Sequence, residues 1–207
     1  MSMIITLDLS DRDLKHFTGL IESAREAAAD KSNDEIAQAA TDLLLKAQGG
    51  DQPGFVKDRL LMLDTMIAML RDTGWALGGD DAEHVRSALA YFAKAADTIP
   101  DHVPLVGFLD DAVLIELCAR ELRHEIDAYD DFCDFRQREA ERRSLDPQAV
   151  GRADWLSARR EELQDRMHRR RSREGSKGPG VGYGTSSGYA SNRSYVSNNV
   201  VPLFRCV

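Results

Sequence analysis

The sequence predicts an all-α protein: a compact bundle of five or six helices followed by a disordered C-terminal tail. Apolar side chains recur at the 3.6-residue spacing of a helix from about residue 10 to residue 170. Beyond Arg173 the composition changes to Gly, Ser, Asn and Tyr, which bury too little apolar surface to offset the entropy of ordering. We therefore expect one helical domain over residues 1–172 and a disordered tail over residues 173–207.

Capping residues and apolar stripes mark the first three helices. Ser10 and Asp13 form an N-cap pair before the first stripe, and Ser32 and Glu35 form a capping box for the second. The segment 55–70 is apolar nearly all round, which is typical of a central, buried helix. The stripes of the first two helices are Leu14, Phe17, Ile21, Ala24 and Ala28, and Ile36, Ala40, Leu43 and Leu44.

Three further helices lie around a proline-containing segment. The fourth helix weakens at Ile99, because a proline disfavours helical conformation in the residue before it. A long helix is predicted from about Asp111 to Arg143, and Asp146-Pro147 supplies an N-cap and a first helical residue for the last one. The apolar positions are Val85, Ala88, Leu89, Phe92 and Ala95 in the fourth helix, and Val150, Ala153, Leu156, Leu163 and Met167 in the last.

The segment 99–111 is the most distinctive of the chain, with two prolines, a glycine and three aspartates among apolar residues. We interpret it as a rigid corner between two helices, in which Gly107 permits a close approach or a positive φ. Asp110 and Asp111 would then cap the next helix and face its positive dipole end. The alternative is that Asp101, Asp110 and Asp111 converge on a divalent cation, as in a metal-dependent hydrolase.

This segment resembles the signature of the YkvA-like family, small helical proteins defined by a domain without an assigned activity. The matching residues are Ile99, Pro100, Asp101, Pro104, Gly107, Asp110 and Asp111. The similarity covers about residues 86–120, implies a helical fold and brings no catalytic residue with it. Thr98 and His102 are more polar than the residues usual at these two positions of the family, so the corner is less apolar. This argues against the membrane association that has been suggested for some relatives.

Glu121 and His124 have the E-x-x-H spacing of carboxylate di-iron bundles, and Glu125 follows directly. That chemistry needs a second E-x-x-H and two further glutamates on facing helices, which the sequence does not supply. We expect Glu121 and Glu125 to pair instead with arginines of neighbouring helices, for example Arg59, Arg71 or Arg86.

Charge is distributed unevenly along the chain. Residues 1–150 carry 30 acidic and 16 basic side chains, a formal charge of −14, whereas residues 151–207 carry 5 and 11, a charge of +6. A polyanion would therefore meet the C-terminal part, through the basic segment 158–177 with Arg169, Arg170, Arg171 and Arg173.

The predicted tail contains two further features. Tyr183, Tyr189 and Tyr195 stand six residues apart, and the chain ends in an apolar stretch, residues 200–207, with Leu203 and Phe204. A polar spacer that leads to a short apolar terminus is typical of a tethered docking peptide. The other interpretation is that this end folds back onto its own domain.

These observations favour a non-enzymatic helical module that binds another protein, needs no cofactor, and uses the three tyrosines, Leu203 and Phe204 as contacts. The alternatives are a peripheral membrane or nucleic-acid binder acting through residues 158–177, and a metal-dependent enzyme using the motif aspartates. The chain has three cysteines without a close pair, no secretory signal and no apolar run of about 20 residues. These features predict a cytoplasmic protein, which under the first alternative would be peripheral to the membrane.

Overall fold

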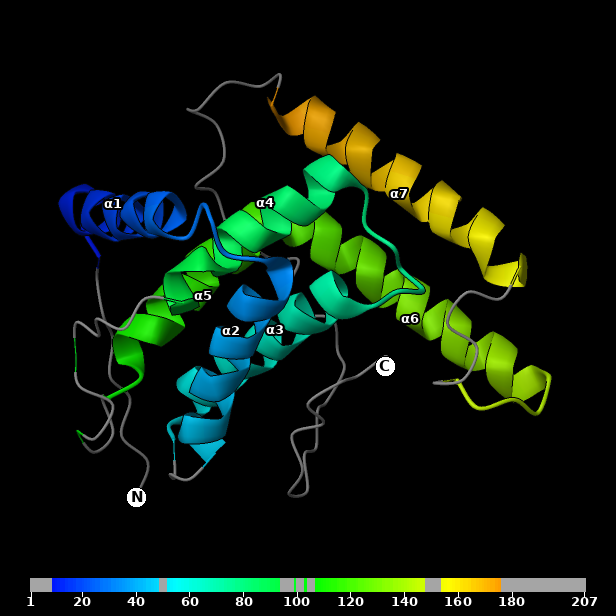
Figure 1. Ribbon diagram of the computed structural model, residues 1–207, viewed down its shortest axis with the longest axis horizontal. Coiled ribbons are helices and arrows are strands. Elements are labelled where there is room, and N and C mark those ends of the chain that lie inside the picture. The colour runs from blue at the N-terminus through cyan, green and yellow to red at the C-terminus, as the bar shows by residue number, and fades with distance from the viewer. Residues whose placement is uncertain are drawn as a thin grey trace. The chain divides into compact units, whose positions relative to one another are not determined.

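The computed structural model describes residues 9–48, 52–93, 107–147 and 154–175, together with Ile99 and Val103. Within these residues all regular structure is helical, with seven α-helices, one 3-10 helix and no strand (Figure 1). The all-α class predicted from the sequence is therefore confirmed. The chain divides into two compact units: unit 1 lies within residues 1–71 and 78–122, and unit 2 within residues 72–77 and 123–207. The single domain expected over residues 1–172 stays a prediction.

Unit 1 contains α1 (Asp11–Ala27), α2 (Asn33–Gln48), α3 (Gly54–Arg71), α4 (Gly79–Leu89), the 3-10 helix η1 (Ala90–Ala93) and α5 (Leu109–Glu121). Both predicted capping boxes are present. The Ser10 amide donates to the Asp13 carboxylate at 3.0 Å, and the Asp13 amide donates back to the Ser10 hydroxyl at 3.4 Å. Ser32 and Glu35 repeat the arrangement at 2.7 and 3.3 Å. Each pair satisfies two N–H groups that the first turn leaves without a helical partner.

The core of unit 1 forms around α3, which packs against α2, α4 and α5. Figure 1 shows α2 and α3 side by side. Residues 63–69 of α3 are all buried, as the apolar pattern predicts, but its first turn is not, because Phe55 is 42% exposed. The short helix α5 is buried over a larger share of its length than α3.

Two of the predicted helices have different boundaries. The fourth is α4 to Leu89 and then the 3-10 helix η1 to Ala93, and its predicted apolar position Ala95 lies outside the described residues. The long helix expected over residues 111–143 is two helices, α5 and α6 (Arg123–Arg142), separated at Leu122 with φ −93° and ψ 14°. No glycine or proline stands at this break, so the sequence carried no signal for it.

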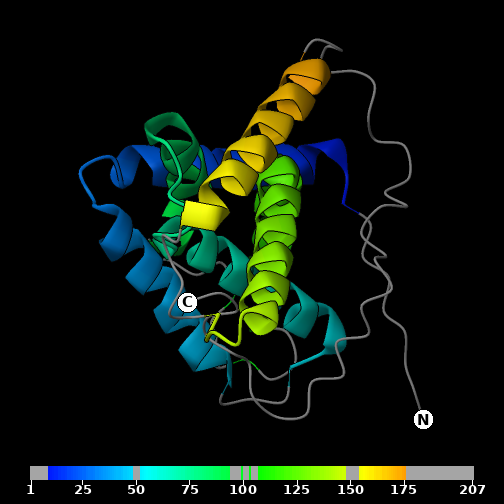
Figure 2. The same ribbon diagram turned by 90° about the vertical axis from the view of Figure 1, so that its right-hand side faces the viewer.

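Unit 2 contains the helices α6 and α7 (Asp154–Gly175), which pack side by side as an antiparallel pair (Figure 2). Pro147 lies in a turn and α7 begins at Asp154, so the expected start at Asp146-Pro147 is wrong. Helix α7 also runs to Gly175, past the expected start of the tail at residue 173. Its predicted apolar positions Leu156, Leu163 and Met167 are buried, whereas Val150, Ala153 and residues 176–207 lie outside the described residues.

Helix α6 ends in a turn that reverses the chain. The Leu145 amide donates to the Ala140 carbonyl at 2.9 Å, and Ser144 adopts the left-handed conformation with φ 55°. This is the position at which helices most often carry glycine, because a Cβ atom is strained there.

Candidate functional site

We call the segment 99–111, which carries the family signature, the family corner. Hydrogen bonds to the backbone hold the described part of this corner. The Gly107 amide donates to the Val103 carbonyl at 2.9 Å, and α5 begins at Leu109. The N-cap residue is Phe108, which has no capping side chain, so the expectation that Asp110 caps this helix is wrong. Asp110 is instead the second residue of α5, and its Oδ2 accepts the amide of Ile99 at 2.9 Å. Its carboxylate therefore joins the two sides of the corner.

Asp110 and Asp111 are both buried, at 3% and 4% exposure. They lie in the first turn of α5, where N–H groups without a helical partner and the positive end of the dipole favour a carboxylate. Pro100, Asp101 and Pro104 lie outside the described residues. Among those described, no group of three His, Cys, Asp or Glu side chains is placed to hold a metal ion. A metal site that includes Asp101 stays a prediction.

The E-x-x-H motif is divided between two helices. Glu121 is the last residue of α5, and its Oε1 lies 2.7 Å from Arg25 Nη2 and 3.2 Å from His84 Nε2. Hydrogen bonds from His84 and then Arg25 lower the pKa of Glu121 despite its partial burial. Because the break at Leu122 separates Glu121 from His124, the two side chains do not share the face of one continuous helix.

His124 and Glu125 belong to α6 and make contacts with α7. His124 Nε2 lies 2.7 Å from Glu174 Oε2, which also pairs with Arg123. Glu125, which is fully buried, accepts from Arg171 at 2.7 Å. The expectation that Glu121 and Glu125 pair with arginines of neighbouring helices is therefore confirmed, and the arginines are Arg25 and Arg171.

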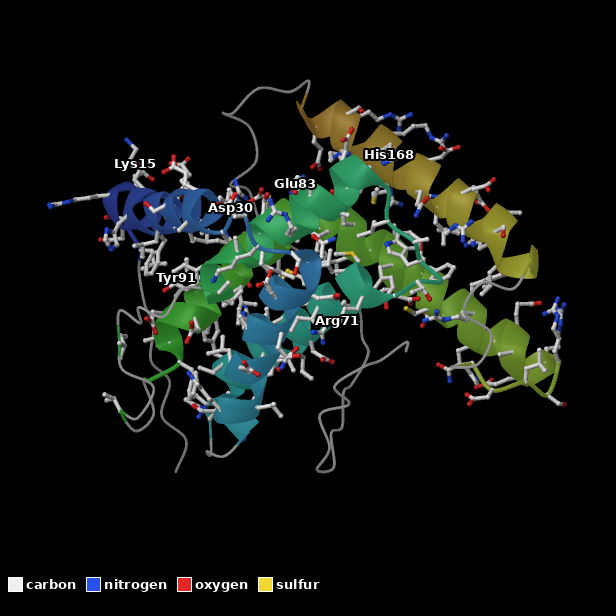
Figure 3. The ribbon with its side chains drawn as sticks, viewed as in Figure 1. Lys15, Asp30, Arg71, Glu83, Tyr91 and His168 are labelled. Atoms are coloured by element: carbon white, nitrogen blue, oxygen red, sulfur yellow. The ribbon has the colours of Figure 1, made fainter. Side chains whose placement is uncertain are left out.

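The arginines named as examples have other partners. Arg59 pairs with Glu116 at 2.9 Å, and Arg71 donates to Gln38 at 3.3 Å. Arg86 pairs with Glu83, which Figure 3 labels on α4, at 2.6 Å. The Arg86 guanidinium also donates to the carbonyls of Ala28 and Lys31, both at 3.1 Å, and so ties α4 to the turn after α1.

Cys118 in α5 has a buried, free thiol. Its Sγ donates to the Ala88 carbonyl at 3.1 Å, and burial raises the pKa of the thiol to about 12. Since the thiolate is the nucleophilic form of cysteine, the burial and the raised pKa of Cys118 both disfavour a role as a nucleophile.

Unit 2 contains a buried ion pair that the sequence did not indicate. The Asp72 carboxylate accepts from Arg136 at 2.8 and 3.1 Å and from the Tyr129 hydroxyl at 3.0 Å. It also accepts the amides of Gly74 and Trp75, at 2.7 and 3.2 Å. Asp72 and Arg136 are 6% and 3% exposed, so the group is shielded from water. Burial is the main cause that raises the pKa of Tyr129.

This ion pair fixes the segment 72–77 against α6 and α7. The Trp75 ring lies 5.8 Å from the ring of Tyr129 and 5.2 Å from that of Phe132. From α7, Arg160 donates to the Gly74 carbonyl at 3.3 Å and Gln164 to the Trp75 carbonyl at 2.9 Å. With its polar groups satisfied and buried, the ion pair holds this segment in place and offers no surface to a substrate.

The basic segment is largely engaged within unit 2. Facing pairs join α6 and α7 along a line that we call the seam: Asp131–Arg166, Asp127–Arg170 and Glu125–Arg171, at 3.8, 3.9 and 2.7 Å. Arg169 and Arg173 are exposed and form no ion pair with another described residue. The predicted contacts Tyr183, Tyr189, Tyr195, Leu203 and Phe204 lie outside the described residues.

None of the described helices has the length and apolar character that crossing a membrane requires.

Within the described residues the regular structure is all helical, and the corner places a buried aspartate, Asp110, close after Gly107. Residues 85–117, from the middle of α4 into α5, match the family "Protein of unknown function (DUF1232)". The match confirms the YkvA-like resemblance and assigns this segment to a domain of unknown function. No curated protein and no solved structure matches the chain.

Proposed function

We propose that the protein is a non-enzymatic helical module that binds another protein, with the apolar C-terminus as its docking segment. The observation that carries the proposal is the role of Asp110. Its carboxylate holds the Ile99 amide inside the family corner and is 3% exposed, which supports a structural role for the family motif.

The C-terminal residues supply the second argument. Residues 200–207 contain three valines together with Leu203 and Phe204, at the end of a polar segment rich in Gly, Ser and Asn. Burial of such side chains in a partner's groove stabilises a complex by roughly 1.5–3 kcal/mol for each large residue. A short apolar peptide on a polar spacer is therefore suited to bind a protein surface.

The experiment is capture of partners by the full chain and by Leu203→Asp/Phe204→Asp, followed by titration of the captured protein after purification. A matched control, Asn198→Asp/Asn199→Asp, adds the same two charges outside the apolar stretch. We expect the first variant to lose binding at least tenfold and the control to bind like the wild type. Raising the salt from 50 to 500 mM should change this affinity little, because apolar burial is not screened.

Removal of residues 176–207 tests whether the tail also belongs to the fold. The cut after Gly175 leaves α7 complete, and we expect the melting temperature to change by less than about 2 °C. A decrease of many degrees would contradict the proposed docking role, because the tail would then be part of the folded core. Equal binding by the Leu203→Asp/Phe204→Asp variant and the control would contradict it as well.

A further inference from the structure

The arginines of α7 fall into two groups. Five of the seven are engaged: Arg159 with Glu162, Arg160 with the Gly74 carbonyl, and Arg166, Arg170 and Arg171 with carboxylates of α6. Arg169 and Arg173 have exposed side chains and no ion pair among the described residues. They are four residues apart, which places them one above the other on one face of the helix. We call this pair the free arginine face.

The free arginine face lies at the basic end of the helix. Asp165, four residues before Arg169, is the nearest carboxylate toward the start of α7 on that side, and Glu174 is engaged by Arg123 and His124. After Glu174 the chain has no Asp or Glu, and it carries Lys177, Arg193 and Arg205. Positive charge therefore continues from the face into the residues that follow.

We propose that the free arginine face binds the phosphate backbone of a single-stranded nucleic acid, in addition to the proposed protein interaction. Two guanidinium groups on one face supply several N–H donors each and suit phosphate oxygens. Tyr183, Tyr189 and Tyr195 follow at equal spacing, and tyrosine rings stack on unpaired bases without sequence preference. Charge and aromatic rings in succession are the combination that single-strand binding uses.

A membrane is a weaker match to the same face. A helix that lies on a bilayer inserts an apolar face, but the large apolar side chains of α7 whose burial the structure describes, Leu156, Leu163 and Met167, are at most 1% exposed. The exposed residues around the free arginine face are His168, Ser172 and charged side chains, with His168 labelled in Figure 3. Around the free arginine face, the described side chains therefore offer lipid headgroups charge without a large exposed apolar side chain to insert.

The test measures the binding of a fluorescently labelled, 20-nucleotide oligodeoxythymidine to the full-length protein by fluorescence anisotropy, at 50 and 200 mM salt. The test variant is Arg169→Gln/Arg173→Gln. The matched control is Arg166→Gln/Arg170→Gln, which removes the same two charges from the seam. We expect the test variant to bind at least tenfold more weakly, with a salt slope reduced by about 1.4, since single strands give about 0.7 for each phosphate contact. We expect the control to bind within about twofold of the wild type.

A third variant, Tyr183→Ala/Tyr189→Ala/Tyr195→Ala, separates stacking from charge. It should weaken binding several-fold and leave the salt slope unchanged, because stacking releases no counterions. Equal losses in the test and seam variants would reduce the effect to net charge and overturn the proposal. So would an unchanged tyrosine variant, or tight binding of phosphatidylglycerol vesicles together with weak binding of the oligonucleotide. The Leu203→Asp/Phe204→Asp variant retains every arginine and tyrosine of this site, so loss of the protein interaction is measured separately.

Discussion

Units 1 and 2 each bury an aspartate carboxylate beside a segment that connects helices, but they satisfy it differently. Asp110 in unit 1 accepts the backbone amide of Ile99. Asp72 in unit 2 also accepts backbone amides, those of Gly74 and Trp75, but adds two bonds from the Arg136 guanidinium and one from the Tyr129 hydroxyl. The bond to Ile99 spans 11 residues of the chain, and the ion pair with Arg136 spans 64.

The comparison indicates what each aspartate contributes. A carboxylate that accepts an amide at the start of a helix shapes its own neighbourhood, and the helix dipole stabilises its charge. A carboxylate buried with a distant arginine depends on the whole unit being folded, because neither charge tolerates burial alone. The family corner is thus stabilised by residues that are close together in the chain, whereas the ion pair forms only when unit 2 is folded.

The largest effect is expected from Arg136→Met, which leaves the Asp72 carboxylate buried without a cation. Removing one partner of a buried ion pair costs about 3–5 kcal/mol of the free energy of unfolding. Urea unfolding followed by tryptophan fluorescence measures this loss, and Trp75 is a reporter within the same segment. The double variant Asp72→Asn/Arg136→Met should recover part of it. A loss below 1 kcal/mol in the single variant would show that unit 2 does not depend on the pair.

A smaller loss is expected at the family corner. Asp110→Ala removes the acceptor of the Ile99 amide and should cost about 1–3 kcal/mol, the penalty for an unsatisfied polar group. Asp110→Asn retains a carbonyl oxygen at this place and should cost less than half as much. Thermal melts with and without 5 mM Mg²⁺ or Mn²⁺ separate this role from metal binding. Equal losses in both variants, with a wild-type melting temperature raised by the cation, would favour the metal hypothesis.

Ser144→Gly should stabilise unit 2 by about 0.5–1 kcal/mol. Ser144 has φ 55°, a conformation that glycine adopts without strain from a Cβ atom. Ser144→Ala keeps the Cβ atom and serves as the matched control, for which we expect no gain. A difference in melting temperature between the two variants measures the strain of the turn, and identical values would exclude it.

The smallest effect concerns the pH dependence of unit 1. The pKa of Glu121 lies below its ordinary value of 4.5 in the folded protein, so the ionised form adds stability above this pH. That contribution is lost as the pH falls through 4.5 toward the folded value. Stability should therefore decrease less between pH 5 and pH 3 in Glu121→Gln than in the wild type. Because Glu121 is one-third exposed, solvent screening keeps the difference small, and parallel pH profiles would contradict the assignment.

Features set by neighbouring residues could be predicted from the sequence. The two capping boxes were correctly identified because a cap and its partner are three residues apart and interact wherever the helix lies. The all-α class follows from apolar periodicity, and the family segment follows from a run of 13 residues that includes two prolines and a glycine. All of these are local properties of the chain.

The tertiary structure alone decided which charges meet. Seven arginines in α7 are chemically alike in sequence, yet two of them, Arg169 and Arg173, form no ion pair with another described residue. Packing against α6 and the segment 72–77 selects four of the other five, and only Arg159 has its carboxylate partner within α7 alone. The partners on the two sides of the break at Leu122 are likewise distant in the chain: Glu121 pairs with Arg25 and His84, whereas Arg123 and His124 pair with Glu174. Pairing energies depend on distance in space and burial, and neither can be read from the separation of two residues along the chain.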